Sequence, residues 1–192
     1  MVAVKLSLIG NIIDYRAKSF LNVEEEIDHP FKGNFMINNE NNLATFKYDQ
    51  FTGSLNKGNN IIYLADNAGE VGFDKLLIEE LIEELGKQVI YMVRGKPIIN
   101  DAFIEDAIFC GINKVAKITS SGSDATGTLL KYCSPEFIKL CQNAELIISK
   151  RQRNYKTLLE GDKPIFFIFR AKCPVIPEDV GCDLGDMILV DR

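Results

Sequence analysis

Short apolar runs alternate with stretches of helical periodicity from residue 60 to the end of the chain. The run at 61–65 contains no polar residue, which is typical of a strand buried on both faces of a sheet. Similar patterns predict further strands at 89–93, 114–118, 145–149, 165–169 and 187–190, the last as an edge strand.

The segments between these strands have the pattern of amphipathic helices. In the segment 71–85, Phe73, Leu77, Leu81 and Leu85 recur every four residues while glutamates fill the opposite face. Shorter helices are expected at 102–110, 128–133, 135–143 and 154–160. Strands that alternate with helices predict an α/β fold: a doubly wound, mostly parallel sheet flanked by helices.

The first 59 residues do not alternate in this way. The segment 2–15 has helical character, with Leu6, Ile9 and Ile13 on one side, and 35–58 is polar and rich in asparagine. We therefore divide the chain into a partial helical subdomain with a connector (1–59) and an α/β metal- and phosphate-binding domain (60–192). We expect the apolar stripe to lack partners, so that the isolated chain either forms a homo-oligomer through this helix or depends on a missing segment.

Composition and charge narrow the class of protein. Twenty-seven acidic residues against 22 basic ones give a net charge of −5, which argues against a nucleic-acid partner. No apolar run approaches the length of a membrane span, and the first residues do not have the pattern of a secretory signal. The five cysteines are widely spaced and odd in number, as expected for free thiols in a cytoplasmic protein. The single histidine, His29, excludes a multi-histidine zinc site.

Polar residues follow several of the predicted strands, where ligands bind in open α/β sheets. Asp66 and Asn67 follow the first strand and Asp101 follows the second, and their oxygens suit magnesium, manganese or a similar ion. The loop 121–124 offers backbone N–H groups to an anion, and Lys150 offers a positive charge. A metal beside a phosphate-binding loop and a lysine is what phosphoryl hydrolysis requires. The alternative is that the two aspartates cap helices and the loop is an ordinary turn.

Other phosphate-binding and hydrolase motifs are absent. No GxxxxGK[ST] or GxGxxG sequence occurs, which argues against a P-loop ATPase and a dinucleotide-binding protein. The second aspartate of a haloacid-dehalogenase motif would stand at position 68, which is Ala68. No G-x-S-x-G elbow occurs either.

Taken in order, six blocks of the sequence resemble the DUF89 family of damage-control phosphatases, most of all its archaeal subfamily I. The blocks lie at 10–14, 63–70, 99–102, 121–128, 150–155 and 171–175. The resemblance implies a metal-dependent phosphatase acting on small phosphorylated metabolites, such as sugar phosphates or related damaged metabolites. It implies that Asp66, Asn67 and Asp101 are catalytic and hold a divalent ion (manganese, cobalt, nickel or magnesium). The substrate and its phosphate would be bound by further residues of these blocks: Glu70, Asn100, Ser121, Gly122, Ser123, Asp124 and Lys150.

The sequence departs from the family pattern in two places. Arg151 and Arg153 stand where the family has glycines, and Lys156 stands where it has glutamate. The family also has a longer N-terminal helical region with a CxxC motif, of which this sequence holds only the end. These departures leave open a degenerate, non-catalytic paralogue that binds metal or a phosphorylated ligand without turnover. A nucleotide-binding subunit of a larger complex is a third reading, supported only by the fold class.

Overall fold

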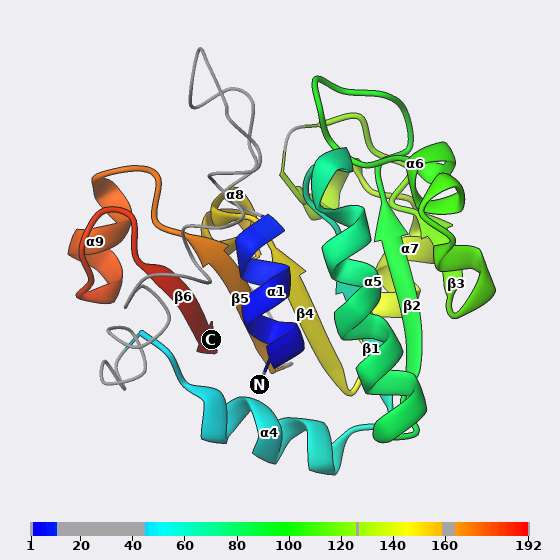
Figure 1. The fold of residues 1–192 in the computed structure, drawn as a ribbon. Coiled ribbons are helices and arrows are strands. Elements are labelled where there is room, and N and C mark those ends of the chain that lie inside the picture. The colour runs from blue at the N-terminus through cyan, green and yellow to red at the C-terminus, as the bar shows by residue number, and fades with distance from the viewer. Residues whose placement is uncertain (1, 11–44, 126, 159–163, 192) are drawn as a thin grey trace.

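A six-stranded sheet forms the centre of the protein (Figure 1). The computed structural model describes residues 2–10, 45–125, 127–158 and 164–191. The strand order is β3-β2-β1-β4-β5-β6, with β6 antiparallel to β5 and all other neighbours parallel. The predicted doubly wound, mostly parallel sheet is therefore confirmed. The strands are β1 (Asn60–Leu64), β2 (Gln88–Val93), β3 (Lys117–Ser120), β4 (Leu146–Lys150), β5 (Ile165–Arg170) and β6 (Met187–Asp191).

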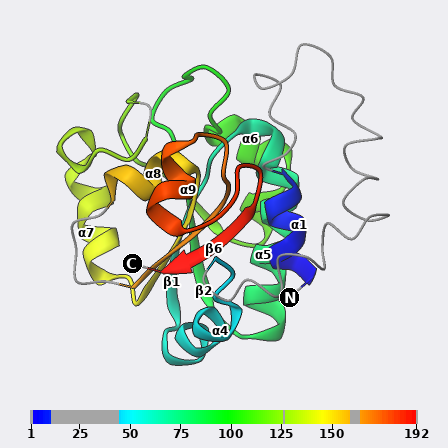
Figure 2. The same ribbon diagram turned by 90° about the vertical axis from the view of Figure 1, so that its left-hand side faces the viewer.

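Helices cover both faces of the sheet, with α1 and α5 on one side and α7 and α8 on the other (Figure 2). Side chains of β1 alternate between the two hydrophobic cores: Ile61 and Tyr63 pack with α5, and Ile62 and Leu64 pack with α7. The helices are α1 (Val2–Gly10), α4 (Tyr48–Lys57), α5 (Val71–Glu79), α6 (Ile104–Phe109), α7 (Pro135–Asn143), α8 (Gln152–Thr157) and α9 (Val175–Val180). In the part of the chain that is described, no helix is long and apolar enough to cross a membrane.

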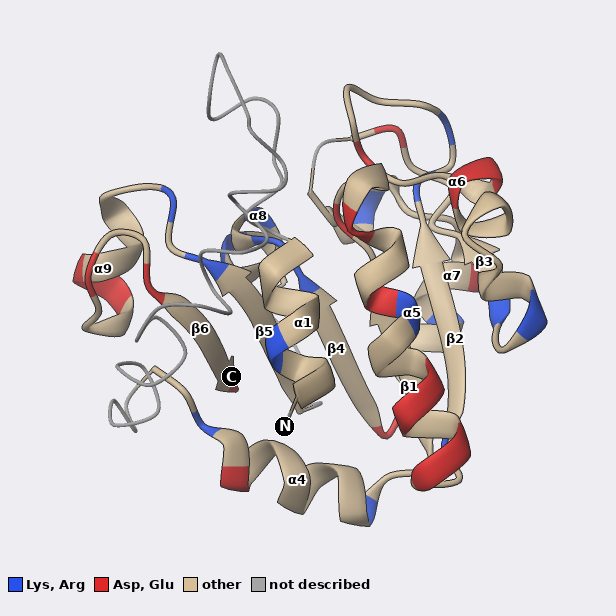
Figure 3. Ribbon diagram, in the orientation of Figure 1, with Lys and Arg blue, Asp and Glu red and all other residues tan. Residues whose placement is uncertain are grey.

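Two of the differences from the sequence-based expectations concern the third strand and the helix predicted at 71–85. The third strand begins at Lys117, because a 3-10 turn at Ile112–Lys114 occupies the start of the predicted strand. The helix predicted at 71–85 is found, but its last part, Glu80–Glu84, is a π-helical turn, whose glutamates are red in Figure 3 like the other acidic residues. Neither difference moves the carboxyl ends of the strands that carry the candidate site.

The segment 48–57, expected to be part of a polar connector, forms α4 instead. Phe51 and Leu55, one helical turn apart, are its buried residues, and the Phe51 ring meets Phe166 of β5 edge-on at 5.2 Å. Two apolar residues among polar ones give a weak periodic signal. Packing against the sheet rather than local propensity accounts for this helix.

The N-terminal helix α1 is an integral part of the core. It packs against α5 and β5, and Ile9 is fully buried while Leu6 is half-buried. The expectation of an unpartnered stripe is therefore wrong for Ile9, whereas Ile13 lies outside the described residues. Self-association through this helix stays a prediction.

Candidate active site

The carboxyl end of β1 marks the position where the chain changes its direction of growth across the sheet. From β1 the chain proceeds to β2 and β3 on one side, and it then returns to β4 on the other. Such a switch point is where ligands bind in open α/β sheets. Asp66 lies two residues beyond β1, Lys150 is the last residue of β4, and Arg151 follows it.

A short backbone pairing brings the two predicted acidic ligands together. Asn67 and Asp101 form an isolated antiparallel bridge, and the Ala102 N–H donates to the Asp66 carbonyl oxygen at 2.8 Å. Asp66, Asn67 and Asp101 are all buried, with 5%, 5% and 3% of their surfaces exposed. The structure therefore places the three predicted ligands side by side, while their role as ligands stays a prediction.

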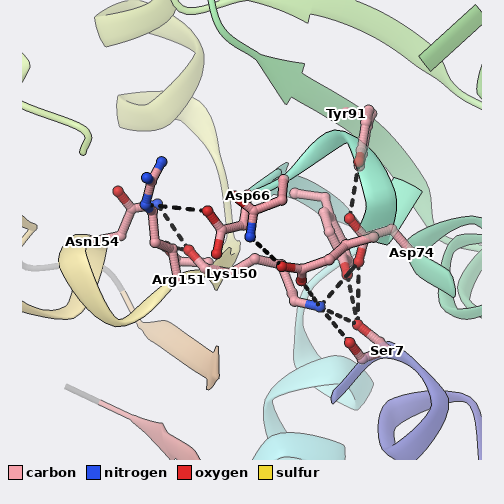
Figure 4. Close-up of polar contacts among 11 residues, drawn as sticks. Ser7, Asp66, Asp74, Tyr91, Lys150, Arg151 and Asn154 are labelled. Carbon is pink, nitrogen blue, oxygen red and sulfur yellow. Dashed lines mark hydrogen bonds and ion pairs between the residues drawn. The ribbon is translucent and has the colours of Figure 1, made fainter. Parts of the chain in front are cut away.

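Arg151 joins the two carboxylates. Its Nε lies 3.1 Å from Oδ1 of Asp66 (Figure 4), and its Nη1 donates to Oδ2 of Asp101. Burial lowers the pKa of the Arg151 guanidinium, but the two acids outweigh burial and raise it above its ordinary value. Burial, together with the charges of Glu70 and Asp101, raises the pKa of Asp66 to about 7, although Arg151 opposes this shift.

Arg94, the residue after β2, is a buried part of the site that the sequence analysis did not single out. Its Nε donates to Oδ2 of Asp101 at 2.9 Å, and its Nη1 donates to the carbonyl oxygen of Gly127 at 3.1 Å. Within the described residues, neither Nη2 of Arg94 nor Oδ1 of Asp101 has a hydrogen-bond partner. Buried polar atoms without partners are uncommon in folded proteins and often mark functional sites.

Lys150 lies on the core side of Asp66 and Asp101, in a fully buried network of polar side chains. Its Nζ lies 3.0 Å from Oε2 of Glu70 and 3.2 Å from Oδ1 of Asp74, and it donates to the carbonyl and hydroxyl oxygens of Ser7 on α1 (Figure 4). Burial lowers the pKa of the Lys150 ammonium, but Asp74 and Glu70 together raise it above the ordinary value. Lys150 thus reaches the core side of the site, and its predicted contact with phosphate stays a prediction.

Two tyrosines complete this network around Asp74. Tyr63 donates to Oδ1 of Asp74 at 2.7 Å, and Tyr91 donates to Oδ2 at 2.9 Å. Burial raises the pKa of the Asp74 carboxyl group even though Lys150 lowers it, and burial with the charge of Asp74 raises the pKa of both tyrosines. A sequence signal existed for Asp74: it lies four residues after Glu70 on the apolar face of its helix, where an acid needs a buried partner.

The predicted phosphate loop packs against the loop that follows β2. Gly95 donates its N–H to the Ser123 carbonyl oxygen at 3.0 Å, and a Cβ atom on Gly95 would lie 2.7 Å from the carbonyl carbon of Gly122. Serine hydroxyl groups accept hydrogen bonds from the N–H groups of Gly122 and Ser123. Two of the amides predicted to bind an anion therefore have internal partners. Ser121 and Ser123 are buried, whereas Asp124 is exposed and Asn100 half-exposed.

The charges and donor atoms of the site determine which ligands it suits. Four acids (Asp66, Glu70, Asp74 and Asp101) face three bases (Arg94, Lys150 and Arg151). Among the described residues, no group of three or more His, Cys, Asp or Glu side chains is placed to hold a metal ion. The oxygens of Asp66, Asn67 and Asp101 nevertheless form a hard donor set that suits a divalent ion, and one Asp101 oxygen has no hydrogen-bond partner.

Comparisons with known proteins point in one direction. A family model described as damage-control phosphatase ARMT1-like domain matches residues 1–188. The chain is 40% identical over 194 residues to an uncharacterised protein of Methanocaldococcus jannaschii, covering 98% of this chain and 62% of that protein. It is 35% identical over 189 residues to a damage-control phosphatase of Pyrococcus horikoshii, covering 97% and 63%.

A solved structure is similar over the same extent. The crystal structure of a DUF89 family protein from Pyrococcus horikoshii matches with a TM-score of 0.83 and 33% identity, over 98% of this chain and 64% of that one. The chain therefore spans somewhat less than two thirds of the length of these relatives.

Proposed function

Since the chain belongs to the damage-control phosphatase ARMT1-like domain family, we propose that it is a metal-dependent phosphatase that hydrolyses small phosphorylated metabolites, such as sugar phosphates. The observation that carries the proposal is the convergence of Asp66, Asn67 and Asp101, all buried, at the switch point of the sheet. A phosphatase needs a cation at such a point, because the charge on the phosphate oxygens must be neutralised during hydrolysis. Oxygen ligands at a strand end supply the place for that cation.

In this proposal Asp66, Asn67 and Asp101 hold the metal ion. When bound, a divalent ion neutralises phosphate oxygens and lowers the pKa of a water molecule that attacks phosphorus. Asn67 is oriented for its role by a hydrogen bond of 2.7 Å from its Nδ2 to Oε1 of Glu70, whose other oxygen lies 3.0 Å from Nζ of Lys150. Lys150 is therefore a positioning residue for the ligand set, in the way that outer partners orient metal ligands.

Phosphate binding is assigned to the side of the site formed by the loops after β2 and β3. Arg94 supports this assignment, because Nη2 of its buried guanidinium has no hydrogen-bond partner among the described residues. The loop of Ser121, Gly122, Ser123 and Asp124 lies beside it, since the residue after Arg94 is hydrogen-bonded to Ser123. An arginine with an unused N–H group is suited to bind a phosphate oxygen.

The test is hydrolysis by the metal-stripped chain of p-nitrophenyl phosphate and of a panel of sugar phosphates. Addition of Mn²⁺, Co²⁺, Ni²⁺ or Mg²⁺ should restore activity, and Asp101→Asn should lower it by about 100-fold or more, because a buried ligand oxygen is lost. Asp106→Asn is the matched control, because Asp106 only caps α6 through the Phe103 N–H at 3.1 Å. A folded chain without activity under all four ions, or activity that is independent of metal, would contradict the proposal.

A further inference from the structure

Arg151 adopts a backbone conformation that favours glycine. Its φ is +89°, and within the described residues only one other non-glycine residue, Ile99, has a positive φ. Such a conformation costs energy for a residue with a Cβ atom and persists only where the surroundings fix it. Here Asn154 fixes it: its N–H donates to the Arg151 carbonyl oxygen at 3.1 Å, and its Nδ2 donates to the Lys150 carbonyl oxygen at 2.9 Å.

The side chain that this strained backbone carries lies against the oxygens expected to hold a metal ion. The guanidinium contacts Asp66 and Asp101 together, so the two carboxylates share its single positive charge. Without the charge of Arg151, four acids would face only Arg94 and Lys150, an imbalance of two formal charges. A divalent ion would balance that charge.

Of the three bases, Arg151 is the one whose side chain is placed to move away from the carboxylates toward solvent. Its side chain is 12% exposed, whereas those of Lys150 and Arg94 are 0% and 5% exposed. Lys150 is also held by Ser7 on α1, and Arg94 by the Gly127 carbonyl oxygen. Among the described residues, the Arg151 side chain forms ion pairs with the two acids and no other hydrogen bond or ion pair, so its guanidinium can move toward solvent without breaking other interactions of the site.

We propose that Arg151 is a displaceable internal counter-ion: its guanidinium occupies the acidic pair Asp66 and Asp101 when no metal is bound, and a divalent ion must displace it to bind. The inference rests on the proposed function, because it assumes that the ion binds to this pair. Arg151 then sets the metal affinity of the protein. It gives the two buried acids a positively charged partner in the metal-free chain, and it makes metal binding depend on the concentration of the ion.

The test is isothermal titration calorimetry of Mn²⁺ into the metal-stripped full chain and its variants. Arg151→Gln removes the charge and retains the strained backbone, whereas Arg151→Gly removes both. Both should bind Mn²⁺ about tenfold more tightly or better, because the ion no longer competes with a charged hydrogen-bonding group. The matched control is Arg153→Gln, which changes an exposed arginine of α8, two residues after Arg151, and should leave the affinity unchanged.

Each of the other possible titration results would overturn the counter-ion role of Arg151, and one of them would also overturn the proposed metal site. Equal affinity of wild type and Arg151→Gln, with Mn²⁺ bound by both, would overturn the counter-ion role while leaving the proposed metal site intact. Tighter binding by Arg151→Gly alone would also overturn it, because the gain would then come from the backbone. Absence of Mn²⁺ binding in wild type and all folded variants would overturn the proposed metal site, and the counter-ion role with it. Thermal unfolding of each variant establishes that it is folded.

Discussion

Replacement of Lys150 by methionine tests whether this lysine stabilises the fold as a buried counter-ion. Its ammonium group lies within 3.2 Å of Glu70 and Asp74, and the side chains of all three residues are completely buried. Methionine has a similar length but no charge, so Lys150→Met leaves two buried carboxylates without their counter-ion. Removal of one partner from a buried ion pair costs about 3–5 kcal/mol, a large part of a typical domain stability of about 5–15 kcal/mol.

The assay is urea unfolding of the metal-free chain at pH 7, followed by circular dichroism. Lys47→Met is the matched control, because the ion pair of Lys47 with Asp191 has a similar distance, 2.8 Å, but side chains that are 30% and 39% exposed. An exposed pair contributes only about 0–1 kcal/mol. Addition of Asp74→Asn to Lys150→Met should restore part of the lost stability. A cost below about 1 kcal/mol for Lys150→Met, equal to that of the control, would refute the reasoning.

Further predictions concern the pH dependence of stability and the packing of the loops. Because the pKa of Asp66 is about 7 in the folded chain and about 3.9 when unfolded, the folded state binds more protons between these values. The free energy of unfolding of the metal-free protein should therefore fall as pH rises from about 4 to 7 and then level off. Urea unfolding of Asp66→Asn across this pH range should show a smaller fall in the free energy of unfolding. Gly95→Ala should destabilise the chain by about 1–3 kcal/mol, because its Cβ would lie 2.7 Å from backbone. Gly53→Ala, within α4 and without neighbours inside 4 Å, should instead stabilise it by up to about 1 kcal/mol in the same assay.

The part of the fold that follows from local pattern was predictable from the sequence. The uninterrupted apolar runs identify the strands, and Pro135 with its preceding serine marks the start of α7 at the predicted residue. The order of the strands predicts that Asp66 and Asp101 come together, because both follow neighbouring parallel strands. The helix α4 was not predicted, because Phe51 and Leu55 are the only apolar residues that mark its buried face. The contact of this face with the sheet cannot be read from the local pattern.

The direction in which each base points could not be predicted. Lys150 and Arg151 are adjacent at the end of β4, yet Lys150 turns toward α1 and Arg151 toward the acidic pair (Figure 4). This division depends on Ser7, which lies 143 residues away in sequence and binds Lys150. The position of Arg94 in the site was not predicted for the same reason, because its partner Gly127 belongs to a loop that is distant in sequence. Such contacts are set by tertiary packing, which leaves no periodic signal in the sequence.

The most direct test of the account is a crystal structure of the chain grown with Mn²⁺ and inorganic phosphate, with the ion located by its anomalous diffraction. We expect one ion at about 2.0–2.6 Å from oxygens of both Asp66 and Asp101. In this crystal the Arg151 guanidinium should have left both carboxylates, and phosphate should lie beside the ion and Arg94. An ion bound elsewhere, with Arg151 still joining the two acids at saturating Mn²⁺, would contradict it.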